Sequence, residues 1–129
     1  MSLIRNSSKV VQAIDFTGVE NGKIHPSDID AVFEFDNKAL ILMEVKYVGT
    51  KIPTGQRMLL ERICDSWHTK MSVVLKVEHD YNGQGDIPLL ACYVSEMYYD
   101  GAWKQIKTRD LKTILNQIGI KWNISKCRF

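Results

Sequence analysis

The chain has 129 residues, which is enough for one compact domain and too few for a multidomain machine. With 45% hydrophobic and 25% charged residues, its composition is that of a globular protein and excludes a disordered chain. Its apolar runs are much shorter than the roughly 20 residues that cross a bilayer, and the amino terminus has no apolar signal-peptide core. We therefore expect a single cytoplasmic domain, residues 1–129, with no membrane partner.

The cysteines and the charge distribution narrow the class of protein further. Cys64, Cys92 and Cys127 include no Cys-x-x-Cys pair, so neither a disulfide framework nor a thiolate zinc site is expected. Residues 102–129 contain seven basic residues and one acidic residue, whereas the rest of the chain contains ten basic and fourteen acidic residues. These basic residues lie within a carboxy-terminal extension that we take as residues 89–129. Such an extension is compatible with a phosphate-bearing partner or with a solvated basic face. The candidate nucleic-acid-binding residues are Lys104, Lys107, Arg109 and Lys112.

Hydrophobic periodicity predicts the elements of the amino-terminal half. A short helix is expected over residues 8–14, followed by a turn at Asn21-Gly22. Residues 28–35 are rich in Ile, Val and Phe and predict a strand, and residues 36–38 supply a turn. Residues 39–48 predict a second strand, nearly continuous in apolar residues as a strand buried on both faces would be. Together the two strands form a hairpin.

A βαβ unit follows from the next two segments. Thr54 is expected to cap a helix that runs to about His68, because the apolar residues recur on one helical face: Leu60, Ile63, Cys64 and Trp67. Gln56 lies one turn before Leu60 on the same inward face. Residues 71–78 predict a strand parallel to the one that precedes the helix.

The carboxy-terminal part predicts a hairpin and a helix. Residues 89–99 and 102–106 flank Asp100-Gly101, a strong two-residue turn. Thr108 is then expected to cap a helix that ends before Gly119, with one apolar face made of Leu111, Ile114, Leu115 and Ile118. The predicted class is α/β, or α+β if the last hairpin enlarges the sheet: a central mixed sheet with flanking helices and an extra carboxy-terminal hairpin and helix.

The predicted first hairpin brings carboxylates together. If the turn is residues 36–38, Asp30 lies directly across from Glu44, and Asp28 lies across from Lys46. Directly opposed β-carbons are about 5 Å apart, close enough for two carboxylates to hold one hard divalent cation. Two like charges within a sheet are unfavourable without such a counter-charge. Lys46 shares the face of Glu44 and adds a positive donor, where a water nucleophile or a phosphate oxygen would need one.

A surface salt bridge between Glu44 and Lys46 is the alternative interpretation, because the tripeptide Glu-x-Lys is common. The surrounding residues favour a functional role, since they mark a buried strand on which two charges are expensive: Leu40, Ile41, Leu42, Met43 and Val45. Asp28 competes with Asp30 as the first carboxylate, because it lies two residues away on the same face.

These residues resemble the signature of the PD-(D/E)XK nuclease superfamily. The resemblance is carried by Pro26-Ser27-Asp28-Ile29-Asp30 and then Glu44-Val45-Lys46. The segments Pro53-Thr54-Gly55-Gln56-Arg57 and Val73-Val74-Leu75 are similar to the virus-type replication-repair nuclease (VRR-NUC) and Holliday-junction resolvase branches. The resemblance covers residues 23–78, within an expected core of residues 16–78 that would be restriction-endonuclease-like.

The resemblance implies a role for each matching residue. Asp30 and Glu44 would bind Mg²⁺ or Mn²⁺ together with the backbone carbonyl of Val45. Lys46 would position the attacking water, and Gln56 would reach the site from the helix. An acidic residue on an early helix often completes the metal shell in such families. Glu20 is the nearest candidate for it, although it precedes Asn21-Gly22 and an exposed loop position is the simpler interpretation.

The expected function is metal-dependent hydrolysis of DNA, selective for a junction, flap or end, in replication, recombination or repair. A homodimer would allow a second strand to be cut, and a phage or mobile-element origin would suit so small a nuclease. One alternative is a catalytically silent nucleic-acid-binding or inhibitor module on the same fold. Another is a metabolic α/β domain with a surface salt bridge at Glu44 and Lys46.

Overall fold

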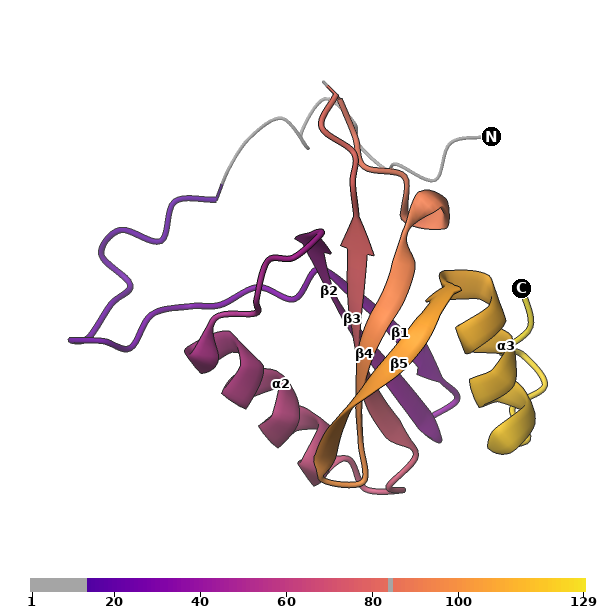
Figure 1. Ribbon diagram of the computed structural model, residues 1–129. Helices are drawn as coiled ribbons and strands as arrows, with labels where there is room; N and C mark the ends of the chain where they lie inside the picture. Colours follow the sequence, from indigo (N-terminus) through magenta and orange to yellow (C-terminus); the bar gives the residue numbers. More distant parts are fainter. Residues whose placement is uncertain (1–13, 84) are drawn as a thin grey trace.

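Five β-strands and two α-helices form the fold of the computed structural model, which describes residues 14–83 and 85–129 (Figure 1). The strands lie side by side in chain order: β1 (Ala31–Phe35), β2 (Ala39–Tyr47), β3 (Ser72–His79), β4 (Tyr93–Tyr99) and β5 (Ala102–Asp110). The helices are α2 (Thr54–Ser66) and α3 (Leu111–Lys121), and a short 3-10 helix, η1 (Leu89–Ala91), precedes β4. In the described part of the chain, no helix is long and apolar enough to span a membrane.

The two helices cover opposite faces of the sheet (Figure 1), and each face has its own core. The core on the α2 face is made of Leu40, Leu42, Leu60, Cys64, Val74 and Tyr98. The larger core on the α3 face includes Ile41, Met43, Val73, Leu75, Val77, Leu111 and Leu115. Strands β2 and β3 are parallel and the other neighbours are antiparallel. The predicted α+β class, a mixed sheet with flanking helices, is therefore confirmed, and so are the carboxy-terminal hairpin and helix.

The first hairpin has the predicted register, with Phe35 opposite Ala39 and Ala31 opposite Met43. Asp36 and Asn37 both adopt positive φ angles, 49° and 60°, which lets the chain reverse tightly. The predicted strand 28–35 is too long, because β1 begins at Ala31. The residues before it are held by side-chain hydrogen bonds in place of strand pairing, as described below for the site.

The βαβ unit is also confirmed, with corrections at both ends of α2. Thr54 was predicted as the cap, but it is the first helical residue and the N-cap is Pro53, whose ring fixes φ near the helix entry. The helix ends at Ser66, before the predicted end at His68. Trp67 leaves the helix with extended backbone angles because its indole Nε1 donates a hydrogen bond to the Lys38 carbonyl, at 3.0 Å.

The second hairpin turns at Asp100 and Gly101 as predicted, both with positive φ. Its first strand begins at Tyr93 and not at residue 89, because residues 88–92 form a 3-10 turn after Pro88. Its second strand continues to Asp110, beyond the predicted end at residue 106.

Both predicted boundaries of α3 are wrong. Asp110 is the N-cap in place of Thr108, and its carboxylate accepts a hydrogen bond from the Thr113 amide at 3.1 Å. Gly119 lies inside the helix: a Cβ there would come within 2.1 Å of the Cys127 carbonyl oxygen, so glycine serves close packing. Asn123, with φ of 55°, takes the left-handed conformation after the helix. The helix predicted over residues 8–14 lies outside the described residues except for Ile14, which is exposed coil.

Candidate active site

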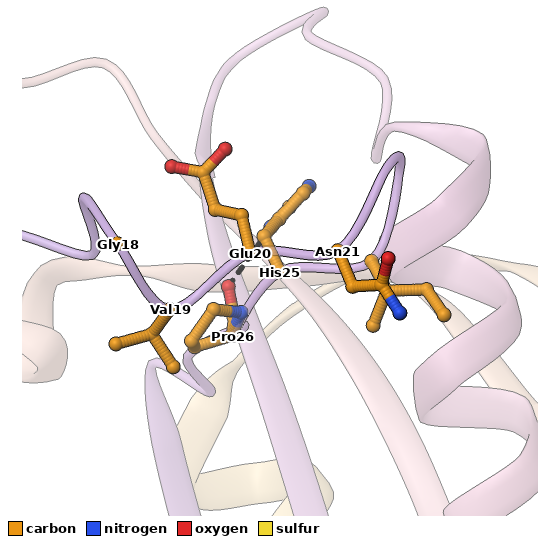
Figure 2. Close-up of a pocket in the computed structure, with 7 residues that line it drawn as sticks. Gly18, Val19, Glu20, Asn21, His25 and Pro26 are labelled. Carbon is orange, nitrogen blue, oxygen red and sulfur yellow. Dashed lines mark hydrogen bonds between the residues drawn. The ribbon is translucent and has the colours of Figure 1, made fainter.

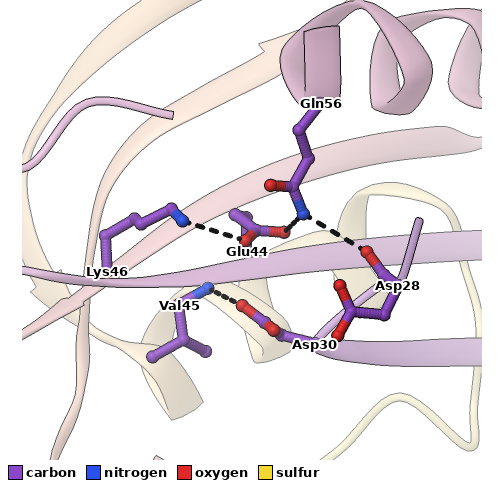
Figure 3. A network of polar contacts seen from close by, with 6 residues as sticks. All are labelled: Asp28, Asp30, Glu44, Val45, Lys46 and Gln56. Carbon is purple, nitrogen blue, oxygen red and sulfur yellow. Dashed lines mark hydrogen bonds and ion pairs between the residues drawn. The ribbon is translucent and has the colours of Figure 1, made fainter. Parts of the chain in front are cut away.

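Glu44 is a carboxylate buried within the central strand β2, with only 2% of its surface exposed (Figure 3). Its Oε2 accepts a hydrogen bond from Gln56 Nε2 at 2.9 Å, and its Oε1 lies 3.4 Å from Lys46 Nζ. Gln56 belongs to the first turn of α2, and Lys46 lies two residues along β2 on the same face. Glu44, Lys46 and Gln56 therefore meet on the α2 face of the sheet, as the sequence predicts.

Asp30 joins this group from the residue just before β1. Continuing the β1–β2 register by one pair places it opposite Glu44, and its Oδ2 accepts a hydrogen bond from the Val45 amide at 2.8 Å (Figure 3). The side chain thus replaces a strand partner for Val45, which explains why the ladder ends at Ala31. The bond gives the Val45 amide a partner where β1 offers no backbone carbonyl.

The Val45 carbonyl opens toward the same side as Asp30. In a β-strand the N–H and C=O groups of one residue point toward the same neighbouring strand. Since the Val45 amide donates to Asp30, its carbonyl oxygen also points toward the β1 side, where β1 has no residue opposite it. Two carboxylates and one carbonyl oxygen are therefore directed to one place at the end of β1.

The environment of Glu44 favours its protonated form. Burial, the negative charge of Asp30 and a hydrogen bond between the two carboxyl groups raise the pKa of Glu44 from 4.5 to about 7, against the opposing effect of Lys46. A carboxyl group with this pKa is poorly stabilised as an anion by the protein alone. An additional positive charge beside Glu44 would stabilise its ionised form.

Asp28 contributes through its backbone. Gln56 Nε2 donates to the Asp28 carbonyl oxygen at 3.2 Å as well as to Glu44, so the amide links the segment before β1 to β2 (Figure 3). The same view shows the Asp28 side chain among the six residues of this polar network. Asp28 thus remains within the site as the alternative first ligand, but it does not lie in a strand opposite Lys46 as predicted.

Glu20 lies elsewhere. It is exposed beside the small turn in which Asn21 and Ile24 exchange backbone hydrogen bonds. It lines an open hollow of about 540 Å³. The other lining residues are Gly18, Val19, Asn21, Ile24, His25 and Pro26, and Glu44 is not among them (Figure 2). The structure does not bring Glu20 to the other predicted ligands, and the exposed-loop interpretation agrees with its position.

The predicted nucleic-acid-binding residues are exposed but do not surround this site: Lys104, Lys107, Arg109 and Lys112. Lys104 pairs with Met97 across β4 and β5, and Met97 packs against the core on the α3 face. Opposed residues of a ladder share a face, so Lys104 lies on the α3 face, away from Glu44. Lys112 belongs to α3 itself.

Three charged residues of the same face were not predicted: Lys76, Glu78 and Glu96. Lys76 is the register partner of Glu44, Glu78 that of Lys46, and Glu96 pairs with Lys76 from β4. Lys76 Nζ lies 3.0 Å from Glu78 Oε1 and 3.6 Å from Glu96 Oε2. The signal was present in the sequence, because Lys76-Val77-Glu78 repeats the Glu44-Val45-Lys46 pattern in reverse within an equally apolar strand.

The donors fit a hard divalent cation. Mg²⁺ prefers oxygen ligands and usually binds one or two carboxylates while keeping several waters, so Asp30, Glu44 and the Val45 carbonyl are a sufficient protein contribution. In residues 14–83 and 85–129, no group of three His, Cys, Asp or Glu side chains is placed to hold a metal. With Glu44 ionised, the charged groups at this end of the face would carry a net charge of −2, which a divalent cation would balance. They are four carboxylates and two lysines: Asp30, Glu44, Glu78, Glu96, Lys46 and Lys76.

Comparison with known proteins adds no relative. Neither models of protein families, nor curated proteins, nor solved structures match this chain. The interpretation of the site therefore depends on its own geometry.

Proposed function

We propose that this chain is a metal-dependent nuclease of the PD-(D/E)XK type that hydrolyses phosphodiester bonds of DNA. The observation that supports the proposal best is the buried Glu44 carboxyl group beside the exposed carboxylate of Asp30, with Lys46 and Gln56 in contact with Glu44. A carboxylate buried in a sheet beside a second negative charge lowers the stability of the fold, so a functional ligand is the simplest reason for Glu44. Hard oxygen donors together with one lysine suit a divalent cation and a phosphate.

Asp30, Glu44 and the Val45 carbonyl would hold Mg²⁺ or Mn²⁺. When bound, the cation supplies Lewis-acid stabilisation of the negative charge that develops on phosphate oxygens. The remaining contributions come from side chains of this chain, and each has a defined position in the structure.

Lys46 is the group that would orient water and phosphate. Its Nζ contacts Glu44 Oε1, while 21% of its side chain remains exposed, so it can also donate hydrogen bonds to a molecule that enters from solvent. A water held there would be directed at phosphorus, and the ammonium charge would favour the added negative charge of the transition state.

Gln56 is a positioning residue for Glu44. Its single amide nitrogen donates both to the Glu44 carboxylate and to the Asp28 carbonyl, which fixes the rotation of Glu44 relative to the segment that contains Asp30. Outer partners of metal-binding carboxylates orient their ligands in this way.

Selection of DNA would depend on shape and phosphate charge. The chemistry involves only the sugar-phosphate backbone, so we propose that the substrate is a junction, a flap or an end, contacted by basic residues of the carboxy-terminal extension. Because Lys104 lies on the α3 face, a DNA that reaches Glu44 and Lys104 together would have to wrap the edge of the sheet at β5.

Cleavage of a labelled panel tests the proposal. The panel contains linear duplex, single strand, flap and four-way junction, each as DNA and as RNA, with Mg²⁺, with Mn²⁺ and with chelator. The wild type is compared with Lys46→Ala and with the control Lys126→Ala, which removes an exposed lysine paired with Asp36. We expect metal-dependent cutting of at least one DNA that is lost in Lys46→Ala and kept in the control. Absence of cutting in every condition would refute the nuclease.

A catalytically silent nucleic-acid-binding module is the second candidate, and one observation favours it. Three of the four carboxylate oxygens already have a protein partner: Glu44 Oε2 accepts from Gln56, Glu44 Oε1 contacts Lys46, and Asp30 Oδ2 accepts from the Val45 amide. Such a module would bind DNA equally well in chelator, with affinity that falls as salt rises and does not change in Lys46→Ala. The same panel, measured by binding, separates the two candidates.

A further inference from the structure

Four charged residues of β2 and β3 form a square on the α2 face. Glu44 and Lys46 alternate along β2, and Lys76 and Glu78 alternate along β3 in the opposite order, so that each acid has a lysine beside it across the strands. Two pairings are open to such a square. The lysines can pair along their own strands, or Lys76 can pair across with Glu44.

The structure adopts the pairing along the strands. Lys46 contacts Glu44 at 3.4 Å, and Lys76 contacts Glu78 at 3.0 Å. In the described part of the chain, Lys76 forms ion pairs with Glu78 and Glu96 and none with Glu44, although Glu44 is its register partner. Glu96 breaks the symmetry of the square, because it offers Lys76 a second carboxylate on the side of β4, away from β2.

Burial makes this choice important for function. Lys76 is 6% exposed and Glu78 is 8% exposed, so neither can simply turn into solvent. A buried ammonium group forms ion pairs with the carboxylates that lie within its reach, because an unpaired buried charge is strongly destabilising. Without Glu78 and Glu96, the carboxylate left within reach of Lys76 on the neighbouring strand is Glu44.

We propose that Glu78 and Glu96 are positioning residues, which hold Lys76 away from Glu44 and so keep Glu44 free to bind a cation. The proposal rests on the proposed metal-dependent function and extends it to residues outside the predicted site. It explains why a buried lysine can lie beside a cation ligand on the adjacent strand without replacing the cation.

Mn²⁺ binding by isothermal titration calorimetry tests the proposal, with the double variant Glu78→Gln/Glu96→Gln. We expect its affinity for Mn²⁺ to fall about 10- to 100-fold, the range for outer partners of metal ligands. Adding Lys76→Met to this variant removes the competing ammonium and should recover most of the loss. Glu61→Gln/Asp65→Asn is the matched control, because it removes the same charge from α2 on the same face, where these acids bind Trp103 and Tyr98. We expect it to weaken Mn²⁺ binding less than 3-fold, because the control charges do not contact Lys76.

A crystal structure of Glu78→Gln/Glu96→Gln provides the second readout. We expect Lys76 Nζ to form an ion pair with the Glu44 carboxylate. Equal losses of affinity in the two double variants, or no recovery with Lys76→Met, would overturn the proposal by showing a general charge effect. If the wild type bound no Mn²⁺ at all, the proposed metal-dependent function would be refuted. The position of Lys76 in the crystal structure of the double variant would still show whether Glu78 and Glu96 restrain Lys76. If the double variant does not fold, the single variant Glu78→Gln, which removes the shorter ion pair of Lys76 at 3.0 Å, should lower the Mn²⁺ affinity less and bring Lys76 Nζ nearer to Glu44.

Discussion

Alternate residues of strands β2 and β3 face α3 and α2, and the two sets of residues differ in polarity. The set on the α3 face is apolar until the last residue of each strand: it consists of Ile41, Met43, Val45, Val73, Leu75 and Val77, and ends in the Tyr47–His79 ring pair. The set on the α2 face is apolar only at its beginning, with Leu40, Leu42 and Val74, and then becomes charged: Glu44, Lys46, Lys76 and Glu78. The α3 face shows that apolar residues can cover these strands at the level of Glu44 and Lys76, where Val45 and Val77 follow directly. The charged half of the α2 face is therefore not a requirement of the fold, and a function is the simpler reason for it.

Replacing Glu44 gives the largest expected effect on function. In Glu44→Gln we expect the affinity for Mn²⁺ and the cleavage rate to fall by more than about 100-fold. Loss of a residue that only orients a metal ligand costs up to about 100-fold, and Glu44 would itself be a ligand. Thermal stability should stay equal or rise, since a neutral amide of the same shape replaces a buried carboxylate. Calorimetric titration and differential scanning calorimetry measure the two quantities. Retained metal binding in the variant would contradict the assignment.

The α3 face should respond in the opposite way. Leu75 is fully buried there, and Leu75→Ala should lower the free energy of unfolding by about 2–5 kcal/mol, as for other large-to-small core substitutions. Its Mn²⁺ affinity should remain within about 3-fold of the wild type under conditions in which it is folded, because the lost contacts lie on the other side of the sheet. Urea denaturation checks the first expectation. A large loss of metal affinity in folded Leu75→Ala would show that the two faces are coupled.

The comparison also predicts a pH dependence of stability without metal. The pKa of Glu44 is raised from 4.5 to about 7, so between these values the native state binds more protons than the unfolded state. Stability must then fall as the pH rises through this window. Urea denaturation of wild type and Glu44→Gln at pH 4.5, 6 and 8 should show a decline in the wild type that the variant lacks. Addition of Mn²⁺ at pH 8 should restore the stability of the wild type. Parallel pH profiles of the two proteins would count against the raised pKa.

Removing the amide of Gln56 has a smaller expected effect. Gln56→Leu loses the hydrogen bonds to Glu44 and Asp28 while keeping the volume of the side chain, and we expect Mn²⁺ affinity to fall about 10-fold. Gln117→Leu on α3 is the control, because Gln117 is exposed on the opposite side of the sheet. An equal response of the two variants would show that the amide of Gln56 does not position Glu44.

The smallest effects are expected for single basic residues. Lys107 lies in the stretch of β5 between Gln105 and Arg109, where the pairing with β4 is irregular, whereas Lys104 lies in regular pairing on the α3 face, away from Glu44. Lys107→Ala should weaken DNA binding a few-fold and lower the slope of log affinity against log salt by about 1, and Lys104→Ala should change it less. Filter binding at several salt concentrations measures both. A larger effect of Lys104→Ala would place the DNA on the α3 face.

The sequence predicts the first hairpin well because local chemistry determines it. A short turn of residues that accept positive φ sets the pairing of β1 with β2, and this pairing places Asp30 beside Glu44. Gln56 could be predicted because helical periodicity directs it inward, together with Leu60. Where the residues that determine a contact lie within a few positions of each other in the chain, the sequence pattern alone predicts how their side chains are placed.

Contacts between distant segments account for the errors. The pairing of Lys76 with Glu96 depends on the register of β3 and β4, which a loop separates. Gly119 has the composition of a helix end, but the approach of Cys127 requires it inside α3. The basic residues of 102–129 are close in sequence and predict one binding surface, but Lys104 lies on the face of the sheet away from Glu44. Composition cannot supply such information, because it emerges only when the sheet is assembled.

Direct titration of Mn²⁺ into the purified protein at pH 8, with Glu44→Gln measured beside the wild type, is the most direct test of the central claim. One binding site in the wild type that is lost in the variant is the predicted result. No binding in the wild type, or equal binding in both proteins, would show that the carboxyl groups of Glu44 and Asp30 do not form a metal site.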